Sequence, residues 1–563
     1  MKEKLQNTIE KALESLSVEA VDFVVEHPAE VAHGDYATNV ALVAAKNLGE
    51  NPRELAEKIM KAVVLQDLPE VEKVTIAGPG FLNFTLSRDF YTAKTELINT
   101  VDGEWGKNNE YLGKKVLVEY TDPNPFKEFH IGHMFTNAVG ESLARLFEMA
   151  GAEVKRLNYQ GDVGMHVASA IWGMQQMGLT ADDKFTPQEL GQAYAKGATA
   201  LKEDKDSKKE IELINQKLYK HTEYDDAVNL LYEKGREVSL AYFEQIYKML
   251  GTKFDEYFFE SEVSSRGVEV VLNNTDVFTE SDGAWVFKGE EYGLHTRVFI
   301  NSLGIPTYEA KELALAKMKQ ERCGDFDLSI ISTANEINEY FKVLLQAMSL
   351  IYPELAQKTE HVGHGMVRLP EGKMSSRTGD VIGAMDFIGE VKKNVETRVK
   401  ESGKEIDEEV IEKVAIGAIK YEVLKGSIFQ DSVFDKAGAL SFEGNSGPYL
   451  QYTYARIQSV AKKAESAGVI PSLDNTPEDI YGVERILYRF PEVVEEAVKE
   501  RLPHKVSVFL SQLANEYNSF YATEKIAESS DEYAPYKLAL SLAVAETLKK
   551  GLWTLGIEAP EKM

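Results

Sequence analysis

The pattern of hydrophobic and polar residues changes twice along the chain, which divides it into three parts. In the first part, helical runs near residues 3–15 and 53–64 flank an Ala-rich helix. Two strand-like runs then follow, separated by Gly-Pro-Gly. This mixture predicts a small α+β domain over residues 1–105.

From Lys115 onward the pattern is that of a βαβ unit. The segment KVLVEYT is typical of a buried strand, a helix follows after a loop, Gly151 ends the helix, and EVKRLNY is the next strand. The helix is predicted to place these apolar residues on one side: Phe135, Val139, Leu143, Leu146 and Phe147. We therefore expect a doubly wound, parallel, Rossmann-like nucleotide-binding sheet over residues 115–385.

The remaining segments complete a multidomain α/β architecture. A polar, helical stretch near residues 180–260 predicts an insertion, after which strand signals return in AWVFKG, TRVFIN and FDLSIIST. From residue 386 to 563 the pattern is almost wholly helical, which predicts an all-α bundle. A length of 563 residues is too great for one core and agrees with several domains.

Composition narrows the class of protein. The net charge of −28 argues against broad, nonspecific nucleic-acid binding but leaves room for a folded RNA held on local basic patches. One cysteine, Cys323, excludes an internal disulfide and a cysteine-cluster zinc site. The charged N-terminus is unlike a signal peptide and no run is apolar enough to span a bilayer, so we expect a cytoplasmic protein without membrane contact.

Two segments carry candidate chemistry. In HIGH, at the start of the predicted helix, His130 and His133 could donate to phosphate oxygens and Gly132 would let a base or phosphate approach the backbone. By itself this pattern fits capping or core histidines equally well. The second segment, EGKMSSRTGDVIG, gathers Lys373 with hydroxyl groups in a loop that could close over a triphosphate. A solvated basic turn explains the loop alone, but the two segments together favour nucleotide chemistry.

The pair of segments resembles the H-I-G-H and K-M-S-K-S motifs of class I aminoacyl-tRNA synthetases. Further segments along nearly the whole chain resemble the arginyl-tRNA synthetase family in particular. They are HGDYATNVA, AGPGFLNFTL, VEYTDPNPFKEFHIGH, NYQGDVGMHVA, FEGNSGPYLQYTYARIQS, NEYNSFY and LGIEAPEKM. The resemblance implies an N-terminal domain that contacts the tRNA elbow, a catalytic domain and a helical anticodon-binding domain.

The resemblance also implies which reaction the protein catalyses. L-Arginine and ATP would form arginyl-adenylate and pyrophosphate, and arginine would pass to the terminal ribose of tRNA(Arg). Mg²⁺ would accompany ATP without a dedicated protein site. The implied ATP-binding residues are His130, Gly132, His133, Lys373, Met374, Ser375 and Ser376.

One position departs from the family's second motif. Ser376 stands where its second lysine would be, and Lys127 resembles the lysine that replaces it in some members. The expected catalytic residues are His130, His133, Lys373 and Lys127, while Arg377 is a competing candidate and Lys127 could also be merely solvated.

The arginine site can be approached from the chemistry of its ligand. A guanidinium needs carboxylates and a planar neighbour, and Tyr308 and Glu312 lie four residues apart, on one helix face. The resemblance implies that arginine contacts Glu119, Asn124, Tyr308 and Glu312. Glu312 stands where the family often has aspartate, and Ile337 stands where it usually has glutamine.

The tRNA contacts are less well defined. Aromatic residues near 441–460 could stack on anticodon bases, although their helical spacing also fits a core. The candidate contacts are Asn39, Tyr449, Gln451, Arg456 and Met563. The sequence does not determine the oligomeric state, and a monomer is our expectation.

Three other functions were weighed. A cysteinyl- or glutamyl-type synthetase is the alternative within the class, but the zinc thiolate site expected of a cysteinyl enzyme needs more than one cysteine. A small-molecule nucleotidyltransferase would leave the N-terminal and C-terminal parts without a purpose. A non-catalytic RNA-binding relative would not be expected to keep His130, His133 and Lys373.

Overall fold

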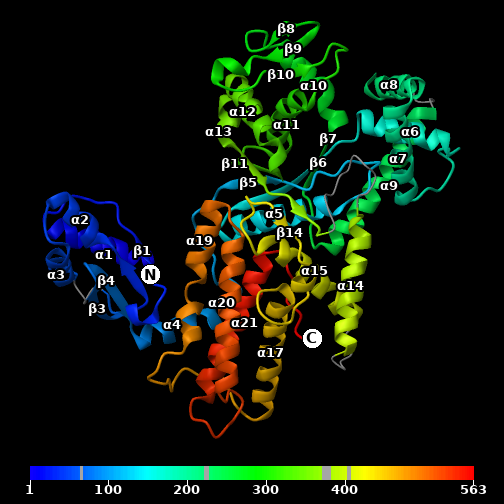
Figure 1. Ribbon diagram of the computed structural model, residues 1–563. Coiled ribbons are helices and arrows are strands. Elements are labelled where there is room, and N and C mark those ends of the chain that lie inside the picture. The colour runs from blue at the N-terminus through cyan, green and yellow to red at the C-terminus, as the bar shows by residue number, and fades with distance from the viewer. Residues whose placement is uncertain (64–67, 221–226, 371–381, 402–406) are drawn as a thin grey trace. The chain divides into compact units, whose positions relative to one another are not determined.

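The computed structural model describes residues 1–63, 68–220, 227–370, 382–401 and 407–563 (Figure 1). The chain forms two compact units, and each contains more than one stretch of sequence. The first unit contains residues 1–106, 453–493 and 512–550, and the second contains residues 107–452, 494–511 and 551–563.

The N-terminal part of the first unit is a four-stranded antiparallel sheet, in the order β1-β2-β4-β3, with helices around it. Its strands are β1 (Val25–Glu26), β2 (Tyr36–Thr38), β3 (Val71–Ala77) and β4 (Phe81–Leu86). Its helices are α1 (Lys2–Ser15), η1 (Val31–His33), α2 (Val40–Leu48), α3 (Pro52–Ala62) and α4 (Arg88–Thr100). The predicted α+β architecture is confirmed, but the sequence pattern had not assigned α4.

Local chemistry explains why these helices begin where they do. Asn51 caps α3, because its Oδ1 accepts the backbone N–H of Arg53 at 2.9 Å, and Pro52 occupies the first helical position. Ser87 caps α4 through the N–H of Phe90. The later segments of this unit are joined to the N-terminal ones by a buried ion pair, in which Arg485 Nη1 lies 2.8 Å from Asp35 Oδ1.

The C-terminal part of the chain is helical, as predicted. Its helices are α14 (Ala384–Glu401), α15 (Glu408–Leu424), α16 (Lys436–Ala439), α17 (Gly447–Ser466), α18 (Gly482–Leu487), α19 (Phe490–Glu500), α20 (His504–Thr523) and α21 (Ala534–Thr554). One short strand interrupts them, β14 (Ser432–Val433), which pairs in parallel with β13 (Val367–Arg368). None of the helices in the described ranges could cross a membrane.

A five-stranded parallel sheet in the order β12-β11-β5-β6-β7 forms the centre of the second unit. Its strands are β5 (Lys115–Glu119), β6 (Glu153–Gln160), β7 (Glu256–Phe259), β11 (Leu328–Ala334) and β12 (Thr359–His364). The chain starts with β5, adds β6 and β7 on one side, and then returns to add β11 and β12 on the other. The predicted doubly wound sheet is confirmed, and its order reverses between β5 and β11, where such sheets bind ligands.

Helix α5 (Ile131–Met149) connects β5 to β6 and differs from the amphipathic helix that the pattern predicts. Its apolar residues are buried, but so are the polar residues Asn137, Glu141 and Ser142. The reason is that other elements cover the second face. The hydroxyl of Ser142 donates to the Thr554 carbonyl at 2.8 Å, and the Glu141 carboxylate pairs with Arg156 of β6 at 3.1 Å.

Helices and a small second sheet surround the parallel sheet. Figure 1 shows one group of helices around the predicted insertion, and another group with the small sheet. The first group is α6 (Met165–Gln176), α7 (Pro187–Glu203), α8 (Lys205–Lys220) and α9 (Ala227–Met249). The second is α10 (Glu260–Leu272), η3 (Gly289–Tyr292), α11 (Tyr308–Cys323), η4 (Asn335–Ile337), α12 (Asn338–Ile351) and α13 (Pro353–Lys358).

The small sheet accounts for two of the strand signals in the sequence. Strands β8 (Thr279–Ser281), β9 (Ala284–Phe287) and β10 (Arg297–Ile300) pair antiparallel in the order β10-β9-β8. AWVFKG and TRVFIN therefore form β9 and β10 of a separate sheet, whereas FDLSIIST forms β11 of the parallel one.

Candidate active site

The candidate site begins at the carboxyl end of β5, next to the point where the strand order reverses. Glu119 is the last residue of β5 and is buried. In the loop that follows, Thr121, Asp122 and Phe126 have φ values of 79°, 43° and 66°, a region that residues other than glycine rarely adopt. Such strained backbone is concentrated at functional sites, because it must be held in place by its surroundings.

His130 and His133 form a reciprocal cap at the start of α5. The Nδ1 of His130 accepts the N–H of Gly132 at 3.1 Å, and the Nδ1 of His133 accepts the N–H of His130 at 3.3 Å. The two rings stack with their centroids 3.8 Å apart. A Cβ on residue 132 would lie 2.9 Å from the His130 ring, so glycine is required for this arrangement.

Burial determines the protonation state of both histidines, and the contacts of their Nδ1 atoms determine which nitrogen carries the proton. Burial lowers the pKa of His130 to about 4 and that of His133 well below its usual value, and the charge of Lys127 lowers both further. Both rings are therefore neutral near pH 7. Because each Nδ1 accepts a backbone N–H, the proton of each ring is on Nε2. Both side chains thus offer an N–H donor without carrying a charge.

The exit of the second motif's loop is bonded to the start of α5. The N–H of Ile131 donates to the Ile382 carbonyl at 3.3 Å, and the N–H of Ala384 donates to the Phe129 carbonyl at 2.8 Å. The motif residues lie outside the described part of the chain: Lys373, Met374, Ser375, Ser376 and Arg377. Lys373 precedes Ile382 by only nine positions, so the chain returns to the histidines shortly after the motif.

Lys127 lies in the loop that leads to the histidines. Its Nζ is 5.1 Å from the centre of the Tyr194 ring, a cation–π contact with α7 of the insertion. Burial lowers the pKa of this lysine, and its charge acts on both His130 and His133.

A cluster of acidic side chains lies beside β5. Lys319 Nζ is 2.9 Å from Glu119 Oε2, and both side chains are almost completely buried. Burial, and then the charge of Glu119, raise the pKa of Glu312 to about 8 and also raise that of Asp122 well above its usual value. Among the described residues, three carboxyl groups thus share the Lys319 ammonium, and the cluster could accept a further cation.

A second buried ion pair borders this cluster. Lys311 Nζ lies 2.7 Å from Glu260 Oε2 and donates to the Tyr219 hydroxyl at 3.1 Å. The Tyr308 ring is 5.2 Å from the same ammonium and 57 % exposed, so a planar group could stack on it. Asn124 is close as well, because a Cβ on Gly161 would meet both Asn124 Oδ1 and Glu260 Oε1.

The structure thus brings Glu119 and Glu312 together. Asn124 and Tyr308 lie near Glu260, which is a neighbour of Glu312. Sequence reasoning missed Asp122, Glu260, Lys311 and Lys319, which complete the electrostatics of the cluster. Lys319 follows Glu312 by seven residues, about two helical turns, so the two side chains share a helix face. Lys317 lies between them, however, so the sequence does not single out Lys319.

The candidate tRNA contacts lie elsewhere in the two units. Gln451 is fully buried, and its Nε2 donates to the carbonyls of Lys413 and Glu558. Asn39 accepts the N–H of Val24, and the Arg456 guanidinium bonds Asn518 and lies over the Tyr521 ring. Tyr449 and Met563 are partly exposed. The RNA contacts stay predictions, and the buried position of Gln451 does not favour a direct one.

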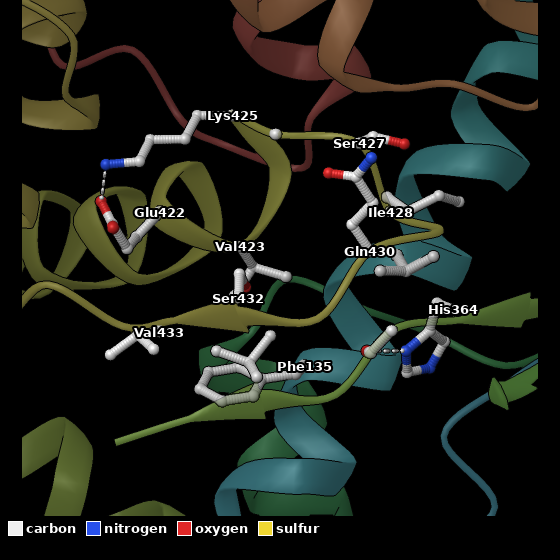
Figure 2. Close-up of a pocket in the computed structure, with 14 residues that line it drawn as sticks. Phe135, His364, Glu422, Val423, Lys425, Ser427, Ile428, Gln430, Ser432 and Val433 are labelled. Atoms are coloured by element: carbon white, nitrogen blue, oxygen red, sulfur yellow. Dashed lines mark hydrogen bonds and ion pairs between the residues drawn. The ribbon is translucent and has the colours of Figure 1, made fainter. Parts of the chain in front are cut away.

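A separate pocket of about 100 Å³ lies against α5 (Figure 2). Apolar side chains such as Phe135 and Val423 line it, and Lys425 pairs with Glu422 at 2.7 Å on its border. Within the described residues, its lining includes none of the side chains that the sequence predicts for the site. The described residues also contain no group of three or more histidine, cysteine or acidic side chains that could hold a metal ion.

Three family models match the chain. "tRNA synthetases class I (R), catalytic domain" matches residues 97–436, "DALR anticodon binding domain" matches residues 450–563, and "Arginyl tRNA synthetase N terminal domain" matches residues 3–86. Together these models account for most of the chain.

Similar proteins carry a consistent name. The arginine–tRNA ligase of Clostridium acetobutylicum is 32 % identical over 559 residues, covering 97 % of each chain, and that of Halothermothrix orenii is 30 % identical over 576 residues. Among solved structures, the arginyl-tRNA synthetase of Thermus thermophilus matches with a TM-score of 0.81 and 26 % identity, covering 100 % of both chains.

Proposed function

The chain belongs to the arginyl-tRNA synthetase family of class I, and from this premise we propose which of its residues carry out the reaction. It is an arginine–tRNA ligase, which activates L-arginine with ATP and transfers it to the 3′-terminal ribose of tRNA(Arg). In the first step the arginine carboxylate attacks the α-phosphate and pyrophosphate leaves. Such a step depends on the position of the reactants and on charge stabilisation more than on a protein nucleophile.

The arginine side chain is bound by Glu119, Asn124, Tyr308 and Glu312. The observation that carries this proposal is the acidic cluster beside β5, where Glu119, Asp122 and Glu312 share the Lys319 ammonium among the described residues. A guanidinium would supply the positive charge that this cluster can accept, and its plane matches the exposed ring of Tyr308.

ATP is bound by His130, Gly132, His133, Lys373, Met374, Ser375 and Ser376. The neutral Nε2–H groups of the two histidines donate to phosphate oxygens, where negative charge grows as the α-phosphate is attacked. The positive charges of Lys373 and Lys127 stabilise the negative charge of the leaving pyrophosphate. Support for Lys127 comes from its place three residues before His130 and from the effect of its charge on the pKa of both histidines.

Other parts of the enzyme are proposed on the family's organisation. Mg²⁺ enters with ATP as part of that substrate, because the phosphates supply its oxygen ligands. Domains at residues 1–105, 115–385 and 386–563 hold the tRNA elbow, the reacting groups and the anticodon, with Asn39, Tyr449, Arg456 and Met563 as RNA contacts. Gln451 supports these contacts indirectly, because its side chain bonds the Glu558 carbonyl and so holds the C-terminal segment. The enzyme works as a cytoplasmic monomer.

The variant Glu312→Gln tests the arginine site. Losing one charged hydrogen bond costs on the order of 1.5–3 kcal/mol, so the KM for arginine should rise roughly 10- to 150-fold while the KM for ATP stays nearly constant. Glu321→Gln is a matched control, because Glu321 is on the same helix but pairs with Arg266 at the surface. An unchanged arginine KM in Glu312→Gln would mean that the guanidinium binds elsewhere.

A further inference from the structure

Tyr159, near the end of β6, has a hydroxyl group without an obvious purpose in the free protein. Its side chain is only 8 % exposed, and its hydroxyl has no hydrogen-bond partner among the described residues. Two other buried tyrosines of this unit have bonded hydroxyl groups. The Tyr120 hydroxyl bonds to Glu141, and the Tyr421 hydroxyl bonds to Asn445 and to the Ser507 carbonyl. A buried polar group without a partner is costly and requires an explanation.

The surroundings of this hydroxyl are those of the proposed arginine site. Tyr159 is held by its backbone, because its N–H donates to Asp122 Oδ1 at 2.8 Å. Its ring belongs to the same buried cluster as Leu313, the residue that follows Glu312. Burial raises the pKa of its hydroxyl, and the negative charges of Glu260, Glu312 and Glu119 raise it further. The buried Tyr340 hydroxyl of α12 also has no partner among the described residues and has Glu312 as a neighbour.

The chemistry of the groups near this hydroxyl selects the kind of ligand. Carboxylates are among these groups, and a phenol oxygen has lone pairs that accept hydrogen bonds, so a suitable ligand must bring several N–H donors and a positive charge. A guanidinium has five N–H donors in a fixed plane, which is more than two carboxylates would use in one bidentate and one single contact. Donors would therefore remain for a phenol oxygen.

We propose that the Tyr159 hydroxyl is an additional arginine-binding group, which accepts an N–H from the guanidinium while Glu119 and Glu312 balance its charge. The proposal rests on the arginine site argued above and adds a residue to it. It also explains why the hydroxyl has no partner within the described parts of the chain. Since an ammonium has fewer donors and no planar fork, the same contact favours arginine over lysine.

The variant Tyr159→Phe separates a ligand contact from a structural one. We expect its affinity for L-arginine, measured by titration calorimetry on the full chain, to fall about tenfold, because the lost bond involves a charged donor. The KM for ATP should not change. The Tm without ligand should not fall, because the hydroxyl that is removed bonds to none of the described residues.

Tyr421→Phe is the matched control. Its hydroxyl is bonded in the free protein, so its removal should lower the Tm and leave arginine affinity unchanged. An unchanged arginine affinity in Tyr159→Phe overturns the proposal, and so does a Tm loss equal to that of the control. If the unmutated enzyme binds arginine and Glu312→Gln weakens that binding, either result concerns Tyr159 alone. If Glu312→Gln also has no effect, the arginine site itself is wrong.

Discussion

At the residue scale, Glu312 links arginine binding to a proton. Burial, followed by the charge of Glu119, raises the pKa of its carboxyl group to about 8, so this group is mostly protonated in the free enzyme at pH 7. The folded protein therefore favours the neutral form, and the stability that this form contributes is lost as the pH rises through about 8. A guanidinium favours the carboxylate instead, so a proton and arginine compete for the same group.

We therefore predict that arginine binding near pH 7 releases close to one proton. Affinity should rise about tenfold per pH unit below the pKa of Glu312 and level off above it. Calorimetric titrations in buffers with different ionisation enthalpies measure the released protons directly. In Glu312→Gln the proton release should disappear, and the same release in that variant would assign the proton to another group.

Lys127 makes a second prediction at this scale, because Ser376 stands where the family's motif has a lysine. An ammonium can act from a different backbone position if its tip reaches the same phosphates. Lys127→Ala should lose roughly 10²-fold in kcat, and adding Ser376→Lys to it should restore part of that loss. In the otherwise unmutated enzyme, Ser376→Lys should gain much less, because groups that share one role are not additive.

Rates of adenylate formation for the four proteins complete this double-mutant cycle. Lys184→Ala, which removes an exposed lysine of the insertion, serves as a control for loss of charge. If Ser376→Lys has equal effects in both backgrounds, the two positions act independently and Lys127 is not the substitute.

Some of the site could be predicted from single residues and some could not. Glu119 and the two histidines follow from their positions, one at the end of a strand and the others at the start of a helix. Lys311, Lys319 and Tyr159 could not be identified, because a lysine in a helix or a tyrosine in a strand gives no sign of its tertiary neighbours. Only the fold brings them to Glu119, Glu260 and Glu312.

At the element scale, the start of α5 depends on a glycine. A Cβ at residue 132 would lie 2.9 Å from Cε1 and Nδ1 of His130, so Gly132→Ala must displace that imidazole. Alanine also favours the helix itself by about 0.5–1 kcal/mol, which limits any loss of stability. We expect kcat for adenylate formation to fall more than tenfold, the size of effect given by the loss of one phosphate donor, while the Tm changes little.

Gly389→Ala provides the comparison, because a Cβ at this position of α14 meets no atom within 4 Å. It should keep full activity and be slightly more stable. If Gly132→Ala is as active as Gly389→Ala, the position of the His130 ring is not important for the reaction.

The elements themselves were predicted where their pattern is local. Strands β5 and β6, the helical insertion and the C-terminal helices follow from runs of apolar residues and their spacing. The pattern failed for α5, whose polar face is covered by residues more than 400 positions away, such as Thr554. It also did not reveal that β9 and β10 form their own sheet, since strand pairing depends on partners and not on the strand alone.

At the scale of the whole molecule, hydrogen bonds join segments of the second unit that are far apart in the sequence. Lys420 Nζ donates to the carbonyls of Leu250 and Gly556, at 2.5 Å and 2.7 Å, and Gln451 bonds the carbonyl of Glu558. These contacts hold the last residues of the chain against the helices of this unit. Because they join residues more than 100 positions apart, no local pattern predicts them.

The enzyme's identity as an arginine–tRNA ligase is also a property of the whole chain, since it needs ATP, an amino acid and tRNA to meet on one protein. The most direct measurement is the charging of tRNA(Arg) with each of the standard amino acids in turn, with ATP present. We predict that arginine is transferred and that lysine, its cationic competitor, is not transferred at a measurable rate. Transfer of a different amino acid, or no transfer of arginine, would contradict the account.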